Sequence, residues 1–258
     1  MLDSALKALA RLPKEERSLS VIRSALPTTS EEGIGPRLER WCAGSELGWV
    51  FDNDTDLLTL DVERAGFDMT NFLDNDTIRP AVMSYLFERI DMEIDGRPAI
   101  ITIDEFWKAL GDEAFTSFAQ DGLKTYRKRN AMMLFGTQSP ADALRSDISH
   151  TIIEQCATKI LLPNPAAQKE HYMDGLDLSE AEFRMIKTEL TAESRRFLIK
   201  QGHNSVVAEL DLGAMPNELA VLSGRASTVE LVTRLREELG DDPDVWLPRF
   251  HAEREDLR

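Results

Sequence analysis

Apolar residues recur every three or four positions along the first part of the chain, which is the spacing of one helical face. The pattern covers residues 4–12, 15–26 and 36–43, and prolines or a polar loop separate the three stretches. Because a proline ends a helical pattern, we expect three short helices and not one long helix. Residues 1–45 are therefore predicted to form a small helical subdomain. An N-terminal arm that packs on a partner chain is the alternative.

Beyond residue 45, short apolar runs alternate with helical stretches. Residues 78–94 and 113–129 show helical spacing, and each is followed by a run with the composition of a buried strand. Such alternation predicts an α/β core with a largely parallel sheet and covering helices. The expected strands of this sheet are residues 99–103, 131–137 and 158–162.

The later part of the chain predicts further helices and a hairpin. Ser179 begins a helix that runs to residue 190, and Glu182 completes the signature of a capping box. The other expected elements are helices over 141–145, 147–156 and 227–239, hairpin strands over 196–201 and 205–212, a short strand over 219–222 and a polar tail over 241–258. The α/β core is thus expected to span residues 46–240.

Composition limits the class of protein. Hydrophobic residues make up 42% and charged residues 29% of the 258 residues, which is typical of a soluble globular protein. The sequence has no apolar run of the ~18 residues needed to span a bilayer. The charged N-terminus does not resemble a signal peptide. The two cysteines lie far apart in the sequence, so a reducing cytoplasm is the expected compartment.

Charge and metal-ligand spacing disfavour several functions. A net charge of −16 disfavours broad binding to nucleic acid, although a local basic face is compatible with it. Asp52, Asp54, Asp56 and Glu63 imitate a calcium-binding EF-hand loop, but Leu57 stands where the sharp turn needs glycine. We therefore reject calcium at this loop. The four histidines are isolated and lack metal-ligand spacing.

Two carboxylates directly follow the first predicted strand of the sheet. Asp104 and Glu105 end the run 99–103, and ligands of parallel sheets bind outside the carboxyl ends of the strands. Nucleotide hydrolases of the α/β class present their Walker B acids in this way. One acid holds Mg²⁺ through its water shell, and the next orients or deprotonates the attacking water. The alternative is a core strand followed by the solvated start of a helical turn over 106–110.

A polar side chain also follows the second predicted strand. Gln138 both donates and accepts hydrogen bonds, so it can sense a γ-phosphate or position the water. In a parallel sheet the ends of both strands face the same edge. The alternative is that Gln138 caps the turn before Pro140. The two strand ends together favour nucleotide hydrolysis.

Several segments resemble the C-terminal region of the large VirB-type ATPases of type IV secretion and conjugation, the TraC, TrbE and CagE class. The resemblance implies a RecA-like P-loop NTPase core of the HerA and FtsK branch. It also implies a hexameric, cytoplasmic motor, peripheral to the inner membrane, that works with other secretion components including the inner-membrane complex. Residues 1–45 would be the end of a helical insertion. The segments that carry the likeness are LGWVFDN, GFDMTNFLD, SYLFERI, IDEFWKAL, LKTYRKRNA, GTQSP, TIIEQCATKILLPNP and RRFLIKQG.

The resemblance assigns roles to individual residues. Asp104 and Glu105 match Walker B, with Asp104 holding Mg²⁺ through water, and Gln138 matches the sensor glutamine. Arg127 is our candidate for the arginine that a neighbouring subunit supplies to the phosphates, which is worth several orders of magnitude in phosphoryl transfer. The candidate nucleotide-binding cations are Lys124, Lys128 and, more weakly, Arg195. The alternative is that the basic residues only complement a helix C-terminus.

One departure from the family is the absence of a Walker A loop. No Gly-Lys pair occurs anywhere in the chain, and in the family this loop lies upstream of the matched region. The chain is therefore expected to be a C-terminal portion of a longer motor that uses ATP and Mg²⁺, and to be inactive alone. A non-catalytic docking domain for other secretion components is the alternative, and a metal-dependent nuclease is a third hypothesis that the residues support less.

Overall fold

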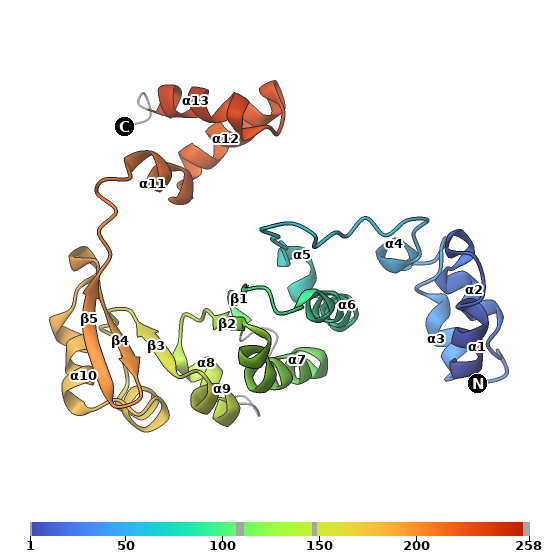
Figure 1. Ribbon diagram of the computed structural model, residues 1–258, viewed down its shortest axis with the longest axis horizontal. Helices are drawn as coiled ribbons and strands as arrows, with labels where there is room; N and C mark the ends of the chain where they lie inside the picture. The colour runs from blue at the N-terminus through green and yellow to red at the C-terminus, as the bar shows by residue number, and fades with distance from the viewer. Residues whose placement is uncertain (1, 107–110, 146–148, 255–258) are drawn as a thin grey trace. The chain divides into compact units, whose positions relative to one another are not determined.

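The computed structural model describes residues 2–106, 111–145 and 149–254. The chain forms two compact units, residues 1–67 and 68–258 (Figure 1). The first unit consists of short helices around a small core of Ala5, Ile22 and Leu26. Its helices are α1 (Leu2–Leu9), η1 (Lys14–Glu16), α2 (Leu19–Ser24), α3 (Ile34–Glu39) and α4 (Gly48–Phe51).

Asp52 joins the start of α2 to the segment that follows α3. Its carboxylate accepts hydrogen bonds from the backbone amides of Leu19 at 2.7 Å and Ala43 at 2.7 Å. The amide and hydroxyl of Ser20 donate to it as well, at 3.2 and 2.5 Å. Burial acts to raise the pKa of Asp52, but these hydrogen bonds outweigh it and hold the pKa below its usual value. Through these bonds, residues after position 45 belong to the first unit. The unit extends to residue 67, whereas the helical subdomain was expected to end at residue 45.

The second unit begins with a parallel pair of strands, β1 (Ala99–Ile103) and β2 (Ala131–Phe135), in register from Ala99 opposite Ala131 to Ile103 opposite Phe135. Both were predicted, and a helical crossover joins them. The surrounding helices are α5 (Thr70–Leu73), α6 (Ile78–Glu93), α7 (Glu113–Thr125) and the short η3 (Tyr126–Arg129). The core of this region is aromatic: Phe87 stacks on Phe118 with ring centroids 4.1 Å apart, and Phe115 is fully buried.

The two strands are not buried on both faces, as their apolar composition predicted. Ile100 is 67% exposed and Met132 54% exposed, whereas Ile101 and Ile103 pack against the core. In the described chain only one face of the pair is covered, so burial alternates along each strand. The helical turn expected after Glu105 falls mainly on residues 107–110, which lie outside the described residues.

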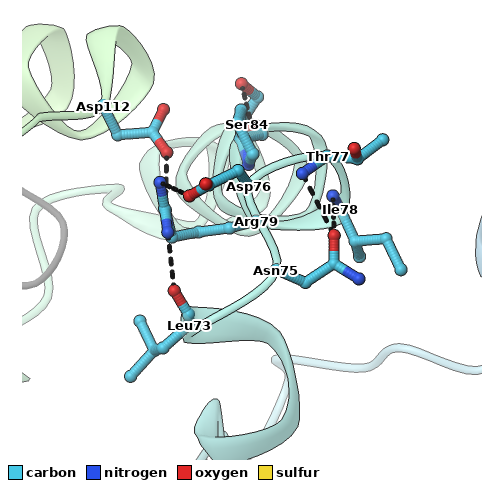
Figure 2. Close-up of polar contacts among 9 residues, drawn as sticks. Leu73, Asn75, Asp76, Thr77, Ile78, Arg79, Ser84 and Asp112 are labelled. Atoms are coloured by element: carbon cyan, nitrogen blue, oxygen red, sulfur yellow. Dashed lines mark hydrogen bonds and ion pairs between the residues drawn. The ribbon is translucent and has the colours of Figure 1, made fainter.

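A network around Arg79 ties the first turn of α6 to the start of α7 (Figure 2). The guanidinium lies 3.3 Å from the buried carboxylate of Asp112 and 2.9 Å from that of Asp76. It also donates to the carbonyl of Leu73 at 2.6 Å. Because Asp112 immediately precedes α7, the three bonds fix the beginnings of both helices that flank β1.

The third expected strand, β3 (Thr158–Leu161), lies in a separate sheet. It pairs antiparallel with β4 (Arg196–Gln201), which forms the predicted hairpin with β5 (Asn204–Glu209). In the described residues the parallel pairing is thus confined to β1 and β2. The helices of this region are α8 (Pro140–Leu144), α9 (Ser149–Gln155), η4 (Glu170–Gly175), α10 (Glu180–Arg184), η5 (Met185–Glu189) and η6 (Ala192–Ser194).

The predicted capping box at the start of α10 is confirmed, and it is part of a buried ion pair. Ser179 and Glu182 exchange the expected hydrogen bonds. Both carboxylate oxygens of Glu182 also lie 3.2 Å from the amine of Lys200, and the two side chains are only 8% and 7% exposed. Burial acts to raise the pKa of Glu182, but the hydrogen bonds, led by those of Ser179, hold it below its usual value.

The C-terminal part contains helices where a strand and a tail were expected. Residues 219–222 belong to α11 (Pro216–Leu222), because Pro216 stands in the first turn, where its fixed φ suits a helix. The expected polar tail over 241–258 is replaced over most of its described part by a helix, since α13 (Pro243–Glu253) packs on α12 (Ala226–Leu239) through the fully buried Phe250. The side chain of Asp242 caps α13. None of the helices in the described chain is both long and apolar enough to cross a membrane.

Candidate functional site

The parallel register brings the carboxyl ends of β1 and β2 to the same edge of the sheet. Ile103 is opposite Phe135, so the residues that follow the two strands emerge side by side. Two further hydrogen bonds continue the pairing past the strands: Gly136 donates its amide to Ile103 at 2.9 Å, and Phe106 donates to Gly136 at 3.3 Å. The chain segments that carry the predicted polar residues are therefore fixed to each other.

Asp104 and Glu105 occupy a tight turn at this edge. The Oδ1 atom of Asp104 accepts the amide of Glu105 at 2.9 Å. Glu105 has φ of 48°, in the left-handed region, which costs about 1–3 kcal/mol for a residue with a side chain. Backbone strain of this size persists only where the surrounding contacts determine it. The two backbone bonds of Gly136, which directly follows the neighbouring strand, hold the turn on either side.

Gly136 also makes room for the Asp104 carboxylate. A Cβ atom at this position would lie 2.7 Å from Oδ1 of Asp104 and 3.5 Å from its Cα. The first distance is shorter than a real Cβ contact allows, so the absence of a side chain at Gly136, directly after β2, lets the carboxylate lie against the backbone there. Sequence reasoning missed Gly136, although a glycine between a buried strand and a polar residue is a signal of close approach.

The structure brings Gln138 directly to the acid pair. Its Nε2 atom donates to Oε1 of Glu105 at 2.7 Å, between residues 33 positions apart in the sequence. Gln138 and Asp104 are exposed and Glu105 is half-buried. The turn before Pro140 is capped by the Ser139 side chain, which accepts the amide of Ala141 at 3.3 Å. The Gln138 side chain therefore bonds to Glu105, and the cap is made by Ser139.

This arrangement has defined chemical capacities. Glu105 offers a carboxylate that can accept a proton from a water molecule, and Gln138 fixes one of its oxygens while keeping a carbonyl oxygen as an acceptor. The neighbouring Asp104 offers hard oxygen ligands of the kind that Mg²⁺ takes. Across the described ranges, no three His, Cys, Asp or Glu residues form a metal cluster. A magnesium ion at this edge could be held by the Asp104 carboxylate.

The basic candidates lie at the other edge of the parallel strands. Lys124, Arg127 and Lys128 fall at the end of α7 and in η3, which directly precedes the amino end of β2. A five-residue strand separates the edges by about 13 Å at about 3.3 Å per residue. All three side chains are exposed, and none forms an ion pair with any described residue. The structure does not bring them to Asp104 or Glu105.

Arg195 is not part of the parallel pair of strands. It stands before β4 in the antiparallel sheet, with φ of 54° in the left-handed region. Its amide donates to Ala192 at 3.3 Å, and its carbonyl accepts the amide of Leu210 at 3.0 Å. Its exposed side chain has no hydrogen bond or ion pair to the part of the chain that the structure describes. The geometry shows a backbone role at the hairpin.

Arg129 is a functional candidate that sequence reasoning passed over, because it is one of several cations in a basic run. Unlike Arg127 and Lys128, it is half-buried and bonded to the end of α6. The available signal was weak: Arg129 is the residue of the run nearest the strand, next to Asn130. Asn130 adopts φ of 59°, the left-handed conformation that asparagine tolerates.

Comparison with known proteins gives consistent matches. A profile of the TraG P-loop domain family matches residues 36–201. The type IV secretion system protein virB4 of Bartonella henselae is 58% identical over 251 residues, covering 97% of this chain and 32% of that protein. Protein virB4 of Agrobacterium fabrum is 41% identical over 236 residues, covering 92% of this chain and 30% of that protein. The chain thus spans about a third of the curated relatives that it matches.

A solved structure shares the fold. The structure of VirB4 of Thermoanaerobacter pseudethanolicus superposes with a TM-score of 0.63 at 19% sequence identity. The superposition covers 84% of this chain and 64% of the solved one. At this identity the likeness concerns the fold alone.

Proposed function

The chain belongs to the TraG P-loop domain family and corresponds to the ATPase region of VirB4-type type IV secretion proteins, and from this premise we propose that it forms the water-activating half of an ATP-hydrolysing motor site. The observation that carries the proposal is the hydrogen bond of 2.7 Å between Gln138 and Glu105 at the carboxyl edge of two parallel strands. This edge is where α/β proteins bind ligands.

Each residue of the edge has a proposed role. Glu105 accepts a proton from the attacking water, and the Gln138 amide holds the Glu105 carboxylate in place. Asp104 would hold Mg²⁺ through a water molecule. Its carboxylate is oriented by the hydrogen bond that it accepts from the Glu105 amide. A bound magnesium nucleotide supplies the phosphoanhydride and the positive charge that balances its phosphates.

Arg127 is proposed to act on the site of a neighbouring subunit. Its place at the amino edge of β2, about 13 Å from its own acid pair by strand length, supports action between subunits over action within one. Its exposure and freedom from ion pairs with the described residues leave the guanidinium available. Lys124 and Lys128 would contact phosphates beside it, and Arg195 would contact the nucleotide. Such an arrangement requires a homo-oligomer, and the family resemblance implies a hexamer.

The phosphate-binding loop is proposed to come from the remainder of the protein. The chain encodes no Walker A loop, while the virB4 relatives are about three times its length. Backbone amides, a lysine and a hydroxyl are what such a loop contributes to phosphate binding. The longer protein would energise substrate transfer or channel assembly in type IV secretion, at the inner membrane and together with other secretion components.

The test is the substitution Glu105→Gln in the full-length protein. The amide keeps the shape of the carboxylate but cannot accept a proton, so turnover of ATP should fall at least about 100-fold. Nucleotide binding should persist within about threefold, because phosphates are held elsewhere. Glu93→Gln, at the exposed end of α6, is the matched control and should leave both unchanged. Turnover of Glu105→Gln within twofold of the unsubstituted protein would remove Glu105 from the mechanism.

A docking domain without catalysis is the second candidate, and the net charge of −16 favours it through an acidic surface. The same variant separates the two functions. Docking in place of hydrolysis would be supported by two results together. Glu105→Gln would leave binding to other secretion components unchanged, and the protein would show no nucleotide-dependent oligomerisation.

A further inference from the structure

The turn that carries Arg127 is attached to the fold at both of its ends. Helix η3 comprises Tyr126, Arg127, Lys128 and Arg129. Tyr126 is 3% exposed and Arg129 is half-buried, whereas the two residues between them are exposed. The cation that we propose to serve a neighbouring subunit therefore projects from a segment only four residues long whose flanks are fixed.

Arg129 is the stronger of the two attachments. Its Nε and Nη2 atoms donate to the carbonyl of Ile94 at 3.1 and 2.6 Å. The Nη2 atom also donates to the carbonyl of Asp91 at 2.7 Å, and Nη1 donates to Oδ1 of Asp91 at 2.6 Å. The Asp91 carbonyl belongs to the last turn of α6, where backbone oxygens have no partner within the helix, and Ile94 is the residue that directly follows the helix. A cation at a helix C-terminus is also favoured by the helix dipole.

Tyr126 supports the same contact from the other side. The Arg129 guanidinium lies over the Tyr126 ring at 5.7 Å from its centroid, and the ring meets Phe118 edge-on at 5.8 Å. The Tyr126 hydroxyl hydrogen-bonds to Asp91. Burial, and then the charge of Asp91, raise the pKa of Tyr126, so the hydroxyl keeps its proton. Asp91 thus joins both ends of the turn to α6.

Asn130 completes the anchorage on the strand side. Its left-handed φ of 59° ends η3, and its side chain donates to the carbonyl of Gly96 at 3.2 Å. Its own carbonyl accepts the amide of Ala99, the first residue of β1, at 3.2 Å. The turn is therefore tied to α6 and to the amino edge of the parallel strands at once.

We infer that Arg129 is a positioning residue that holds the η3 turn so that Arg127 of one subunit is presented to the phosphates bound by the next. The inference rests on the proposed function. Four of the five N–H donors of Arg129 are used at the C-terminal end of α6, by Asp91 and the following Ile94, while Arg127 has no partner among the described residues. A misplacement of a catalytic group by about 1 Å can lower the rate ~10²-fold. The backbone that carries the long Arg127 side chain therefore has to be fixed.

The experiment uses the full-length protein with Arg129→Gln, which keeps a polar side chain but shortens it and removes the positive charge and the fork of donors. Its ATPase kcat should fall roughly 10–100-fold with KM within about threefold, because the arginine acts mainly on the transition state. Arg129→Lys should recover part of the loss. Asp91→Asn, which leaves both carbonyl contacts in place, should show a smaller defect of the same kind. Arg97→Gln removes an exposed arginine paired with Asp95 and is the matched control, with an expected change under twofold.

Mixed oligomers distinguish positioning from a general loss of stability. A subunit with Arg129→Gln keeps its own acid pair, so a neighbour carrying Glu105→Gln and an intact turn should restore its activity, as it should for Arg127→Ala. The inference is wrong if Arg129→Gln lowers activity and its mixture with Glu105→Gln subunits recovers none, although the corresponding Arg127→Ala mixture does. Arg129 would then support only the fold of its own subunit. Full activity of Arg129→Gln alone refutes it as well. If Arg127→Ala itself keeps full activity, the role of Arg127 in the proposed function fails, and this inference fails with it.

Discussion

Gly136 allows the carboxylate edge to be tested without touching an ionisable group. In Gly136→Ala the new Cβ atom would start 2.7 Å from Oδ1 of Asp104, whereas ordinary contacts begin near 3.4 Å. The Asp104 side chain must therefore move by about 0.7 Å, and its hydrogen bond to the Glu105 amide, now 2.9 Å, lengthens or breaks. Loss of one such bond costs about 0.5–1.5 kcal/mol of stability.

The functional cost of this substitution should exceed its cost in stability. Because the atom that meets the methyl group is the end of an exposed side chain, the fold can yield, and unfolding free energy should fall by about 1 kcal/mol. A carboxylate displaced by most of an ångström should lower kcat of the full-length ATPase about 10–100-fold, since catalytic geometry tolerates little displacement. Steady-state ATPase assays and urea unfolding measure the two quantities on the same preparations.

Gly66→Ala is the matched control, because a Cβ atom at Gly66 meets nothing within 4 Å. Gly66→Ala should leave kcat unchanged. Its unfolding free energy should rise only slightly, by about 0.4–1 kcal/mol, because alanine restricts the unfolded chain more than glycine does. In an Asp104→Ala background, Gly136→Ala should cost no stability, since the clashing oxygen is gone. If Gly136→Ala keeps kcat within twofold, the observed place of Asp104 is not required for hydrolysis.

Two further predictions concern this chain alone. Calorimetric titration with magnesium ATP should show at best millimolar affinity, roughly −4 kcal/mol, and no hydrolysis; micromolar binding would show that the phosphates are held by residues within the chain. Stability should fall as the pH drops below about 4.5, the usual pKa of Glu182, because its folded pKa is lower and its favourable contacts are lost as it becomes protonated. Urea midpoints between pH 3 and 6 should therefore depend on pH less steeply in Glu182→Gln, and equal slopes would contradict the assignment.

Local pattern sufficed for the elements that lie at the acid edge. The run AIITI predicted β1 with its observed bounds, and the polar residues after it and after β2 predicted which side chains would meet. Parallel pairing through a helical crossover is enough to bring such residues to one edge. The capping box of Ser179 and Glu182 was predictable for a similar reason, because its bonds join residues three positions apart.

Other features depend on contacts that sequence pattern does not encode. Composition alone did not show that β3 would pair with β4 in a second sheet, because an apolar run pairs equally well in either direction. The run 219–222 has the composition of a strand, yet Pro216 begins a helix through it. The acid of Glu182 was expected to cap a helix, but its buried partner Lys200 comes from a strand 18 residues away.

The same register that joins Gln138 to Glu105 also bears on how the proposed motor would work. Since β1 and β2 are paired over their full length, the acid edge and the η3 turn are held a strand's length apart within one subunit. Arg127 precedes β2, so about 13 Å of strand separates its turn from the acid pair of the same subunit. The pairing thus favours a catalytic unit made by two subunits, with the acids from one and the cation from the next. Hydrolysis would then require assembly of the subunits into an oligomer. The nucleotide bound by one subunit would be contacted by Arg127 from the fixed η3 turn of its neighbour.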